Sequence, residues 1–337
     1  MVTKTITIKD VAKVAGVSTA TVSRALSNPD SVTASTRNQV LKAASDTGYQ
    51  INIAARNLRS QKTGAIVVFV PGLSNPFFSH ILAGIEAEAA IAEKSVFLVN
   101  TQGPDTKNAD TLIRYLTTAR TDGIIILDGS LPKGLLEERY IQGVSPPVVF
   151  GCEWAPTDQF PSVRTNNQKG AALAVDHLLK LGHSSIGHVT GPLWNVLSRE
   201  RIIGVDRTLE GEPFWTFEGD FTMSSGVNAA QAYLNLDQRP TGVFCASDMM
   251  AIGFISELNK AGLSVPDDVS VVGFDDIDIA ERFIPALTTI HQPREMIGSN
   301  AVKLLVEAMN AQDPIIYTEP LVLPVELVVR DSTARSK

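Results

Sequence analysis

Cysteine is scarce in this 337-residue sequence, which also lacks long uninterrupted apolar runs. Its two cysteines, Cys152 and Cys245, lie in apolar stretches, so we expect reduced core residues rather than a disulfide. No stretch approaches the ~18 consecutive apolar residues that a membrane-spanning helix needs. Asp10 precedes any apolar run at the N-terminus, which argues against a secretory signal. We therefore expect a cytoplasmic protein that does not associate with a membrane.

The sequence also lacks the short motifs of common enzymes and cofactor sites. We find no glycine-rich phosphate fingerprint, no P-loop and no Gly-x-Ser-x-Gly nucleophile elbow. The five histidines show no recognised metal spacing, and His183 and His188, beside a strand start, are expected to be surface or core residues. These absences predict no cofactor, no bound metal and no enzymatic activity.

The charge of the sequence is unevenly distributed. With 44% hydrophobic and 19% charged residues, the composition is that of an ordinary globular protein. The net charge of −7 argues at first against a nucleic-acid partner. Residues 1–62, however, hold nine basic and three acidic residues, and the remainder holds 20 basic and 33 acidic ones. A small basic part joined to a large acidic part predicts DNA binding by the first part alone.

Residues 8–26 predict two short helices joined by a tight turn. Thr7 can cap the first helix, with Asp10 at the spacing of a capping box. Gly16 allows the positive φ that the turn needs, and Ser18 can cap the second helix. The inward faces are apolar at helical spacing: Val11, Ala12, Ala15, Val22, Ala25 and Leu26. The pattern is that of a helix-turn-helix.

The second helix leaves Thr19, Ala20, Ser23 and Arg24 on its outer face. Such a face can enter the major groove, where Arg matches guanine acceptors and small methyl groups contact thymine. The alternative is an ordinary helical hairpin with Arg24 in water. The basic charge of residues 1–62 favours DNA binding.

A third helix is predicted from a Thr33 cap to about Asp46, and Gly48 ends it. Residues 50–62 follow, where Asn52 can cap a helix of only two turns, too short to be stable alone. This segment is either a frayed linker or a hinge that becomes helical on DNA, with Leu58 wedged into the minor groove.

From Gly64 the pattern changes to buried strands alternating with helices. The predicted strands fall in two series: Ala65–Val70, Val96–Asn100, Gly123–Leu127 and Val148–Phe150, then Ser162–Thr165, Ile186–Thr190, Phe214–Gly219, Gly242–Cys245 and Val269–Gly273. The predicted helices are Pro76–Glu93, Thr106–Arg120, Gln168–Leu181, Val196–Glu210, Ser224–Leu234, Met249–Ala261 and Arg294–Met309. Continuous apolar strands between helices predict parallel sheets covered on both faces, here in two lobes.

Open parallel sheets bind ligands at the carboxyl ends of their strands. The residues predicted at those ends are Asn75–Phe78, Glu153–Trp154, Trp194–Arg201, Asp220–Phe221, Ser247–Asp248 and Asp275–Asp276. Aromatic faces with Asp, Asn and Arg suit a polyhydroxylated ring. Taken singly, an Asp at a strand end most often caps the next helix and an aromatic residue there is usually core. Together these residues predict a cleft without specifying its contents.

Several of these runs resemble the lactose/galactose-repressor family over nearly the whole chain. The headpiece motifs are Ile8–Ala12, Val22–Leu26, Thr36–Arg37, Gly48–Tyr49 and Ala55–Leu58. The likeness continues in Asn75–Phe78, Gly191–Pro192, Ser198–Arg201, Ser247–Asp248, Val272–Asp276 and Pro285–Pro293. The resemblance implies a transcriptional regulator, a repressor whose DNA affinity is controlled by a small effector.

The resemblance also implies a domain organisation. Residues 1–49 would form an all-α helix-turn-helix headpiece, residues 50–62 a hinge helix or linker, and residues 63–337 an effector-binding core. The core would be two doubly wound parallel-sheet α/β lobes, like a periplasmic sugar-binding protein. Because the family's chain crosses between lobes three times, the N-lobe would comprise about 63–163 and 292–322, and the C-lobe about 164–291 and 323–337.

Two sets of site residues follow from the outer helix face, the strand ends and the resemblance. The expected DNA-contacting residues are Thr7, Ser18, Thr19, Ala20, Thr21, Ser23, Arg24, Asn28, Thr36, Tyr49, Asn52, Ala55, Arg56 and Leu58. The expected effector-binding residues are Phe77, Phe78, Glu153, Trp154, Trp194, Arg201, Phe221, Ser247 and Asp275.

The sequence departs from the family's pattern at points that bear on the ligand. Thr165–Asn166 stands at the lobe crossover, where the family often has an Asp before the Asn. Asn195 stands where the family's purine repressor has an Arg, which favours a sugar or nucleoside over a purine base. No leucine heptads follow Arg330, so the resemblance implies a homodimer rather than a tetramer.

The expected partners are pseudo-palindromic double-stranded operator DNA, a small effector and a second copy of the chain. The alternatives are a periplasmic-type solute-binding protein and a sugar-metabolising enzyme. The missing secretory signal and the basic headpiece oppose the first alternative, and turnover of a candidate ligand would favour the second.

Overall fold

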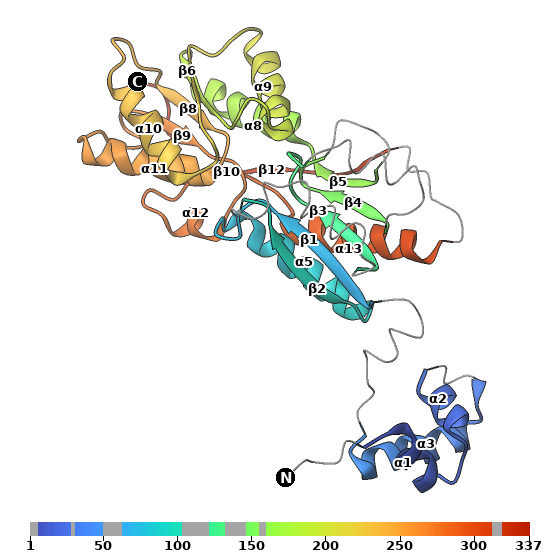
Figure 1. Ribbon diagram of the computed structural model, residues 1–337. Coiled ribbons are helices and arrows are strands. Elements are labelled where there is room, and N and C mark those ends of the chain that lie inside the picture. Colours follow the sequence, from blue (N-terminus) through green and yellow to red (C-terminus); the bar gives the residue numbers. More distant parts are fainter. Residues whose placement is uncertain are drawn as a thin grey trace. The chain divides into compact units, whose positions relative to one another are not determined.

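A computed structural model describes residues 6–27, 31–49, 63–102, 121–131, 146–154, 160–311 and 319–337. The chain divides into two compact units, Met1–Thr63 and Gly64–Lys337, each of which is described by itself (Figure 1). The predicted helix Thr106–Arg120 and residues 50–62, expected to be a hinge helix or linker, lie outside the described residues.

The N-terminal unit contains the three predicted helices, α1 (Ile8–Val14), α2 (Thr19–Ser27) and α3 (Ala34–Thr47). Their starts are fixed by side chains: Thr7 N donates to Asp10 Oδ2 at 2.9 Å, and the Ser18 and Thr33 hydroxyls accept from backbone N–H groups three residues on. Gly16, at φ +62°, makes the turn between α1 and α2, as expected.

Among the described residues of this unit, seven buried side chains form a core. They are Val11, Ala12, Ala15, Val22, Ala25, Val40 and Ala43. Five of them are inward residues predicted from helical spacing on the first two helices. All seven are Val or Ala, so the helices cross closely and the headpiece depends on small, well-fitted side chains.

The first sheet of the larger unit has six parallel strands in the order β11-β5-β4-β3-β1-β2. These strands are β1 (Ala65–Val70), β2 (Ser95–Asn100), β3 (Gly123–Ile126), β4 (Val148–Gly151), β5 (Ser162–Thr165) and β11 (Leu321–Leu323). Helices α5 (Phe77–Ile91) and α13 (Arg294–Asn310) pack against each other beside this sheet (Figure 1). Gly84 and Gly298 allow their close approach, since a Cβ on either would lie 2.2 or 2.1 Å from a facing carbonyl oxygen.

The assignment of Ser162–Thr165 to the second series was wrong. This strand is β5, which pairs with β4 and β11 in the first sheet. Its second neighbour lies more than 150 residues later in the sequence, so local pattern could not reveal the pairing. The chain leaves the N-lobe after Thr165.

The second sheet has four parallel strands in the order β7-β6-β8-β9. They are β6 (Ile186–Thr190), β7 (Trp215–Glu218), β8 (Gly242–Cys245) and β9 (Ser270–Val272). Helices α8 (Asn167–Lys180) and α9 (Val196–Leu209) cover one face, and α10 (Met223–Leu234) and α11 (Asp248–Lys260) the other (Figure 1). This doubly wound arrangement confirms the predicted fold class.

The lobes are joined by three passages of the chain: Thr165–Asn167, Gln292–Arg294, and the residues between β11 and β12 (Glu326–Val328). β12 pairs antiparallel with β10 (Thr289–His291). Beyond β12, the Ser332 carbonyl accepts from Val271 N of β9 at 2.8 Å. The end of the chain therefore contributes to both lobes.

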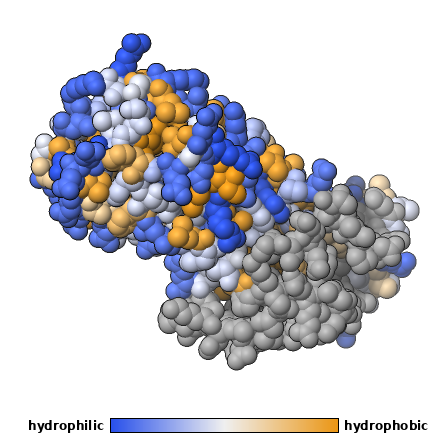
Figure 2. Space-filling view, turned by 90° about the horizontal axis from the view of Figure 1, so that it is seen from above, coloured by the Kyte–Doolittle hydropathy of each residue, from blue (hydrophilic) through white to orange (hydrophobic). Residues whose placement is uncertain are grey.

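No helix in the described ranges is long and apolar enough to cross a membrane. On the face shown in Figure 2, hydrophobic and hydrophilic side chains alternate over the described part of the core. Cys152 and Cys245 are both buried and unbridged, as predicted.

Candidate functional site

The outer face of α2 is the candidate surface for DNA. Thr19, Ala20 and Arg24 are exposed on it, and Thr21 and Ser23 are half-buried beside them. The exposed Arg24 side chain lies along the helix, where its Nε donates to the Ala20 carbonyl oxygen at 3.4 Å. An exposed face of small polar residues and one Arg can fit the major groove.

The other expected DNA contacts lie around this face or outside the described chain. Thr7 and Ser18 cap α1 and α2, and Thr36 lies in the first turn of α3, where helix N-termini can approach phosphates. Tyr49 is half-buried against the headpiece core. The expected contacts outside the described residues are Asn28, Asn52, Ala55, Arg56 and Leu58.

A cavity of about 890 Å³ lies between the two lobes of the core. Seven of the nine expected effector-binding residues line it: Phe77, Phe78, Glu153, Trp194, Arg201, Phe221 and Asp275. The first three belong to the N-lobe and the other four to the C-lobe. Because its walls come from both lobes, a ligand in this cavity would hold them together.

Arg201 of α9 is the central cation of the cavity. It is 2% exposed, its Nε donates to Asn167 Oδ1 at 2.9 Å and its Nη1 donates to the Ala246 carbonyl. The guanidinium lies 3.7 Å from the centre of the Phe274 ring and 3.9 Å from Asp275 Oδ1. Burial lowers the pKa of Arg201, and the nearby Asp275 carboxylate opposes that effect. Arg201 is thus a rigidly positioned donor for a ligand oxygen.

Asp275 is held in place by residues of the lobe crossings. Its Oδ1 accepts from Gln292 Nε2 at 2.8 Å, and Gln292 Oε1 accepts from Thr165 Oγ1 at 2.6 Å. Burial raises the pKa of Asp275 to about 6, against the lowering effect of Arg201 and Arg294. This cavity-lining carboxylate is therefore connected to two of the three passages between the lobes.

Glu153, on the N-lobe side, is a second buried acid. Its Oε1 accepts from Asn195 Nδ2 of the C-lobe at 3.0 Å, and its Oε2 accepts from Gly129 N at 2.7 Å. Burial raises the pKa of Glu153 to about 7, and the neighbouring Asp128 adds to the rise. The Glu153–Asn195 hydrogen bond links the two lobes directly beside the cavity.

Three lining residues have strained backbones. Cys152, Phe221 and Asp275 adopt φ values of +67°, +65° and +121°, which non-glycine residues rarely do. Such conformations cluster at ligand sites, where they orient side chains that a relaxed backbone would turn away.

Two expected effector contacts, Ser247 and Trp154, are not among the described residues that line the cavity. The Ser247 hydroxyl caps α11 by accepting from Met250 N at 3.3 Å. The Trp154 ring packs under the Arg164 guanidinium at 4.3 Å.

Sequence reasoning missed Asp128, which follows the strand β3 and could have been found by the strand-end rule. It also missed the roles of Gln292 and Thr165, for which the sequence carries no local signal.

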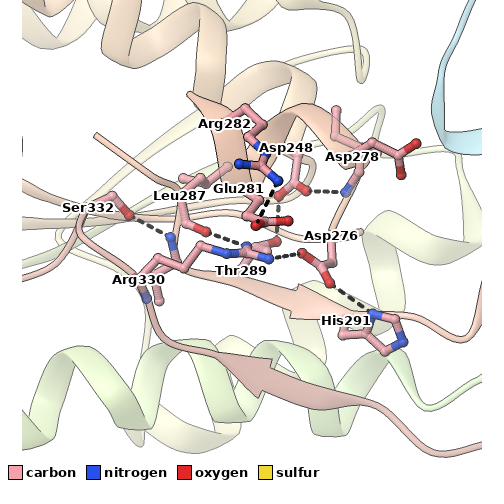
Figure 3. A network of polar contacts seen from close by, with 12 residues as sticks. Asp248, Asp276, Asp278, Glu281, Arg282, Leu287, Thr289, His291, Arg330 and Ser332 are labelled. Carbon is pink, nitrogen blue, oxygen red and sulfur yellow. Dashed lines mark hydrogen bonds and ion pairs between the residues drawn. The ribbon is translucent and has the colours of Figure 1, made fainter. Parts of the chain in front are cut away.

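A polar network supports the loop that carries Asp275 (Figure 3). Asp276 accepts from His291 Nδ1 at 2.9 Å and from Arg330 Nη2 at 2.7 Å. The Asp248 carboxylate accepts from Ile277 N at 2.9 Å. This network ties the end of β9 to β10 and to the C-terminal segment, so the loop that carries Asp275 is held in place by β10 and Arg330.

No group of three His, Cys, Asp or Glu side chains within the described residues could hold a metal ion. His183 and His188, whose place the sequence left between surface and core, are both buried. His188 stacks on Phe244 with ring centres 5.0 Å apart.

Comparison with known proteins identifies both units. Residues 7–52 match the model of bacterial regulatory proteins of the lacI family, and residues 175–333 match a periplasmic binding protein-like domain. The HTH-type transcriptional repressor CytR of Escherichia coli (strain K12) is 40% identical over 334 residues, covering 97% of this chain and 96% of the relative. The HTH-type transcriptional repressor PurR of Photobacterium profundum is 35% identical, with 97% and 98% coverage.

Solved structures of related regulators resemble this chain over most of its length. The lac repressor dimer bound to operator and the anti-inducer ONPF has a TM-score of 0.83 at 31% identity, covering 98% of this chain and all of that one. The transcriptional regulator CelR in complex with cellobiose has a TM-score of 0.72 at 29% identity, covering 97% and 99%. A LacI-family regulator from Enterococcus faecium with bound ribose has a TM-score of 0.71 at 32% identity, covering 81% and 100%. The resemblance inferred from the motifs is confirmed.

Proposed function

This chain belongs to the lacI family of bacterial regulatory proteins and is a DNA-binding transcriptional regulator. From that premise we propose that the headpiece binds DNA and that the core binds an effector. Two headpieces of a homodimer bind the halves of a pseudo-palindromic operator, and an effector in the core cavity changes that affinity. The observation that carries this proposal is the cavity, whose two walls belong to lobes joined by three chain passages. We assign no catalytic role to it, and we place the protein in the cytoplasm with its DNA.

On the DNA side, Thr19, Ala20 and Arg24 of α2 contact base edges in the major groove. The residues at the helix starts, Thr7, Ser18 and Thr36, contact the phosphate backbone. The segment 50–62 inserts Leu58 into the minor groove at the operator centre, which bends the DNA.

On the effector side, the charges of the cavity favour a neutral molecule. Four carboxyl groups line it, from Asp128, Glu153, Asp220 and Asp275, whereas Arg201 is the sole Lys or Arg among the described lining residues. A phosphate or carboxylate would meet this acidic surplus, so phosphorylated sugars and nucleotides are disfavoured. The aromatic rings and the Arg201–Asp275 pair suit a sugar or nucleoside. Two structural neighbours hold cellobiose and ribose, both neutral sugars.

Effector binding is coupled to DNA through lobe closure. A molecule that contacts Arg201 on one side and Glu153 on the other stabilises the lobes at one separation. The core begins at Gly64, directly before β1 of the N-lobe, so any shift of that lobe displaces the end of the hinge segment. The coupling free energy of such a device is typically ~1–3 kcal/mol.

A second copy of the chain covers an apolar edge of the N-lobe. β2 stands at one end of the sheet order, and its Phe97 and Leu98 are exposed, with Ile91 of α5 exposed nearby in the sequence. Such edges are normally covered in solution. The neighbouring lac repressor is itself a dimer.

A thermal-shift screen of the full-length protein tests the effector class. The panel pairs neutral sugars and nucleosides with their phosphorylated counterparts, and each hit is then added to a complex of the protein with promoter fragments. We expect a neutral compound to raise the unfolding temperature and to change the apparent Kd for DNA. Stabilisation by phosphorylated compounds alone would refute the proposal.

A further inference from the structure

Two neighbouring acids form the N-lobe end of the effector cavity. Asp128 and Glu153 follow the adjacent strands β3 and β4, and their residues are 5% and 7% exposed. Asp128 already accepts from Ser130 N at 2.8 Å and from the Thr101 hydroxyl. Glu153 faces the cavity beside it. The N-lobe end of the cavity therefore offers carboxylate oxygens as hydrogen-bond acceptors to a ligand.

The partners of Glu153 fix its role as an acceptor on both oxygens. The side-chain oxygen of Asn195 caps α9 by accepting from Leu197 N at 2.8 Å, so its amide nitrogen must face Glu153 Oε1. Gly129 approaches Oε2 closely and donates its N–H; a Cβ there would lie 3.1 Å from that oxygen. A carboxylate oxygen can accept twice, so each oxygen retains capacity for a ligand donor.

The charged and titratable groups around Glu153 act in both directions. Asp128 after β3 raises its pKa, and Arg201 of α9 lowers it. The buried Cys152 thiol, directly after β4, feels the charges of Glu153, Arg201 and Asp275. Burial is the largest cause of the rise of its pKa to about 7, and Asp128 contributes; Asn195, Gly129 and Arg201 lower it. Both protonation states are therefore populated near neutral pH.

We propose that Glu153 is a specificity-determining residue: its carboxylate accepts an N–H or O–H from the effector, so that effector binding releases a proton from the protein. This inference rests on the proposed function and adds to it the requirement for a donor at the N-lobe end. The proton passes from the Glu153 carboxyl to the buffer, and the hydrogen of the effector takes its place as a hydrogen-bond partner. No covalent bond of the effector changes.

Isothermal titration calorimetry of the full-length protein with D-ribose, cytidine and uridine tests the inference. Affinity is measured at pH 6, 7 and 8, in pairs of buffers with different ionisation enthalpies, which reports the protons released. From the pKa of about 7, we expect binding about tenfold weaker at pH 6 than at pH 8 and release of about half a proton at pH 7.

Glu153→Gln should remove this pH dependence and weaken binding at pH 8, because Gln offers only one acceptor oxygen. The matched control is Glu218→Gln, at the end of β7, where Glu218 accepts from Leu193 N at 3.0 Å without lining the cavity. The control should keep the wild-type pH profile. If Glu153→Gln does not fold, the number of protons that the wild type releases on binding tests the inference by itself.

Equal affinity at pH 6 and pH 8, or the same pH profile in Glu153→Gln as in wild type, would overturn the inference and leave the neutral-effector proposal intact. Failure of all three probes at every pH would contradict the proposed effector class, and this inference would fall with it.

Discussion

Substituting Gly191 by Ala should separate effector binding from DNA binding. Gly191 follows β6, and a Cβ added there would lie 2.1 Å from Phe221 Cζ, 2.3 Å from Phe221 Cε1 and 2.6 Å from Ser198 Oγ. Ordinary contacts between such atoms are about 3.5–4 Å, so the Phe221 ring must move by more than 1 Å. The absence of a side chain at 191 is what lets this ring form a wall of the cavity.

The ring cannot move without leaving that wall. The backbone of Phe221 is held at φ +65°, and the next residue, Thr222, donates its N–H to Asp220 Oδ1 at 3.0 Å and caps α10. The ring therefore rotates away from the ligand or into its space. Loss of the ring contact alone is worth ~0.5–1.5 kcal/mol, about a twofold to tenfold loss of effector affinity, and a ring inside the cavity costs more.

Gly191→Ala also lowers the free energy of unfolding. We expect this loss to affect operator binding less than the displaced Phe221 ring affects effector binding. Overpacking typically costs ~1–3 kcal/mol, or about 2–4 °C of unfolding temperature for each kcal/mol in a domain of this size. The headpiece is a distinct unit, so operator affinity without effector should stay within about twofold of wild type. Calorimetry with the screened effector and fluorescence anisotropy with operator DNA measure the two quantities.

Gly211→Ala is the matched control in the same lobe, because a Cβ at Gly211 meets nothing within 4 Å. It should leave both affinities unchanged. If Gly191→Ala lost stability yet bound effector as tightly as wild type, Phe221 would not be part of the effector site.

Three further predictions address other residues. Arg24→Ala should cost ~1–3 kcal/mol at one base position of the operator in competition binding, whereas Lys42→Ala, on α3, should not change base preference. Asp275→Asn should weaken effector binding about tenfold to a hundredfold by calorimetry, because a charged hydrogen-bond acceptor is lost; an unchanged Kd would contradict its role. Burial lowers the pKa of His188 from 6.5 to about 3, so its contribution to stability is complete above pH 6.5 and declines as pH falls. Urea unfolding should show the wild type losing ~2 kcal/mol between pH 7 and pH 5 relative to His188→Phe, and equal losses in both would refute this.

Most elements could be located from the sequence because their signals are local. Thr33 and Gly48 bound α3 as a cap and a left-handed stop, and the strands β1, β6 and β8 begin and end at the expected residues. The pairing of β5 with β11 was not accessible, since both sheets of the core produce the same alternation of apolar strands and helices.

The candidate site was predictable to the extent that it lies at strand ends. That rule placed Phe77, Glu153, Arg201 and Asp275 around one cavity. Hydrophobic periodicity alone could not have shown that these residues, far apart in the sequence, lie close together. It did not distinguish Ser247, because a hydroxyl at a strand end serves equally as a helix cap. Gln292 acts through Asp275 from a lobe crossing, and only tertiary structure shows such a contact.

The last strands of the chain are paired late in synthesis, and they contribute to both lobes. β11 pairs with β5, β12 pairs with β10, and Ser332 bonds to β9. The ribosome makes these residues after every other strand of the core, whereas the three headpiece helices leave it first. A nascent chain therefore carries a complete set of headpiece helices before it has a complete effector-binding core. Premature termination near residue 320 would leave a headpiece without effector control.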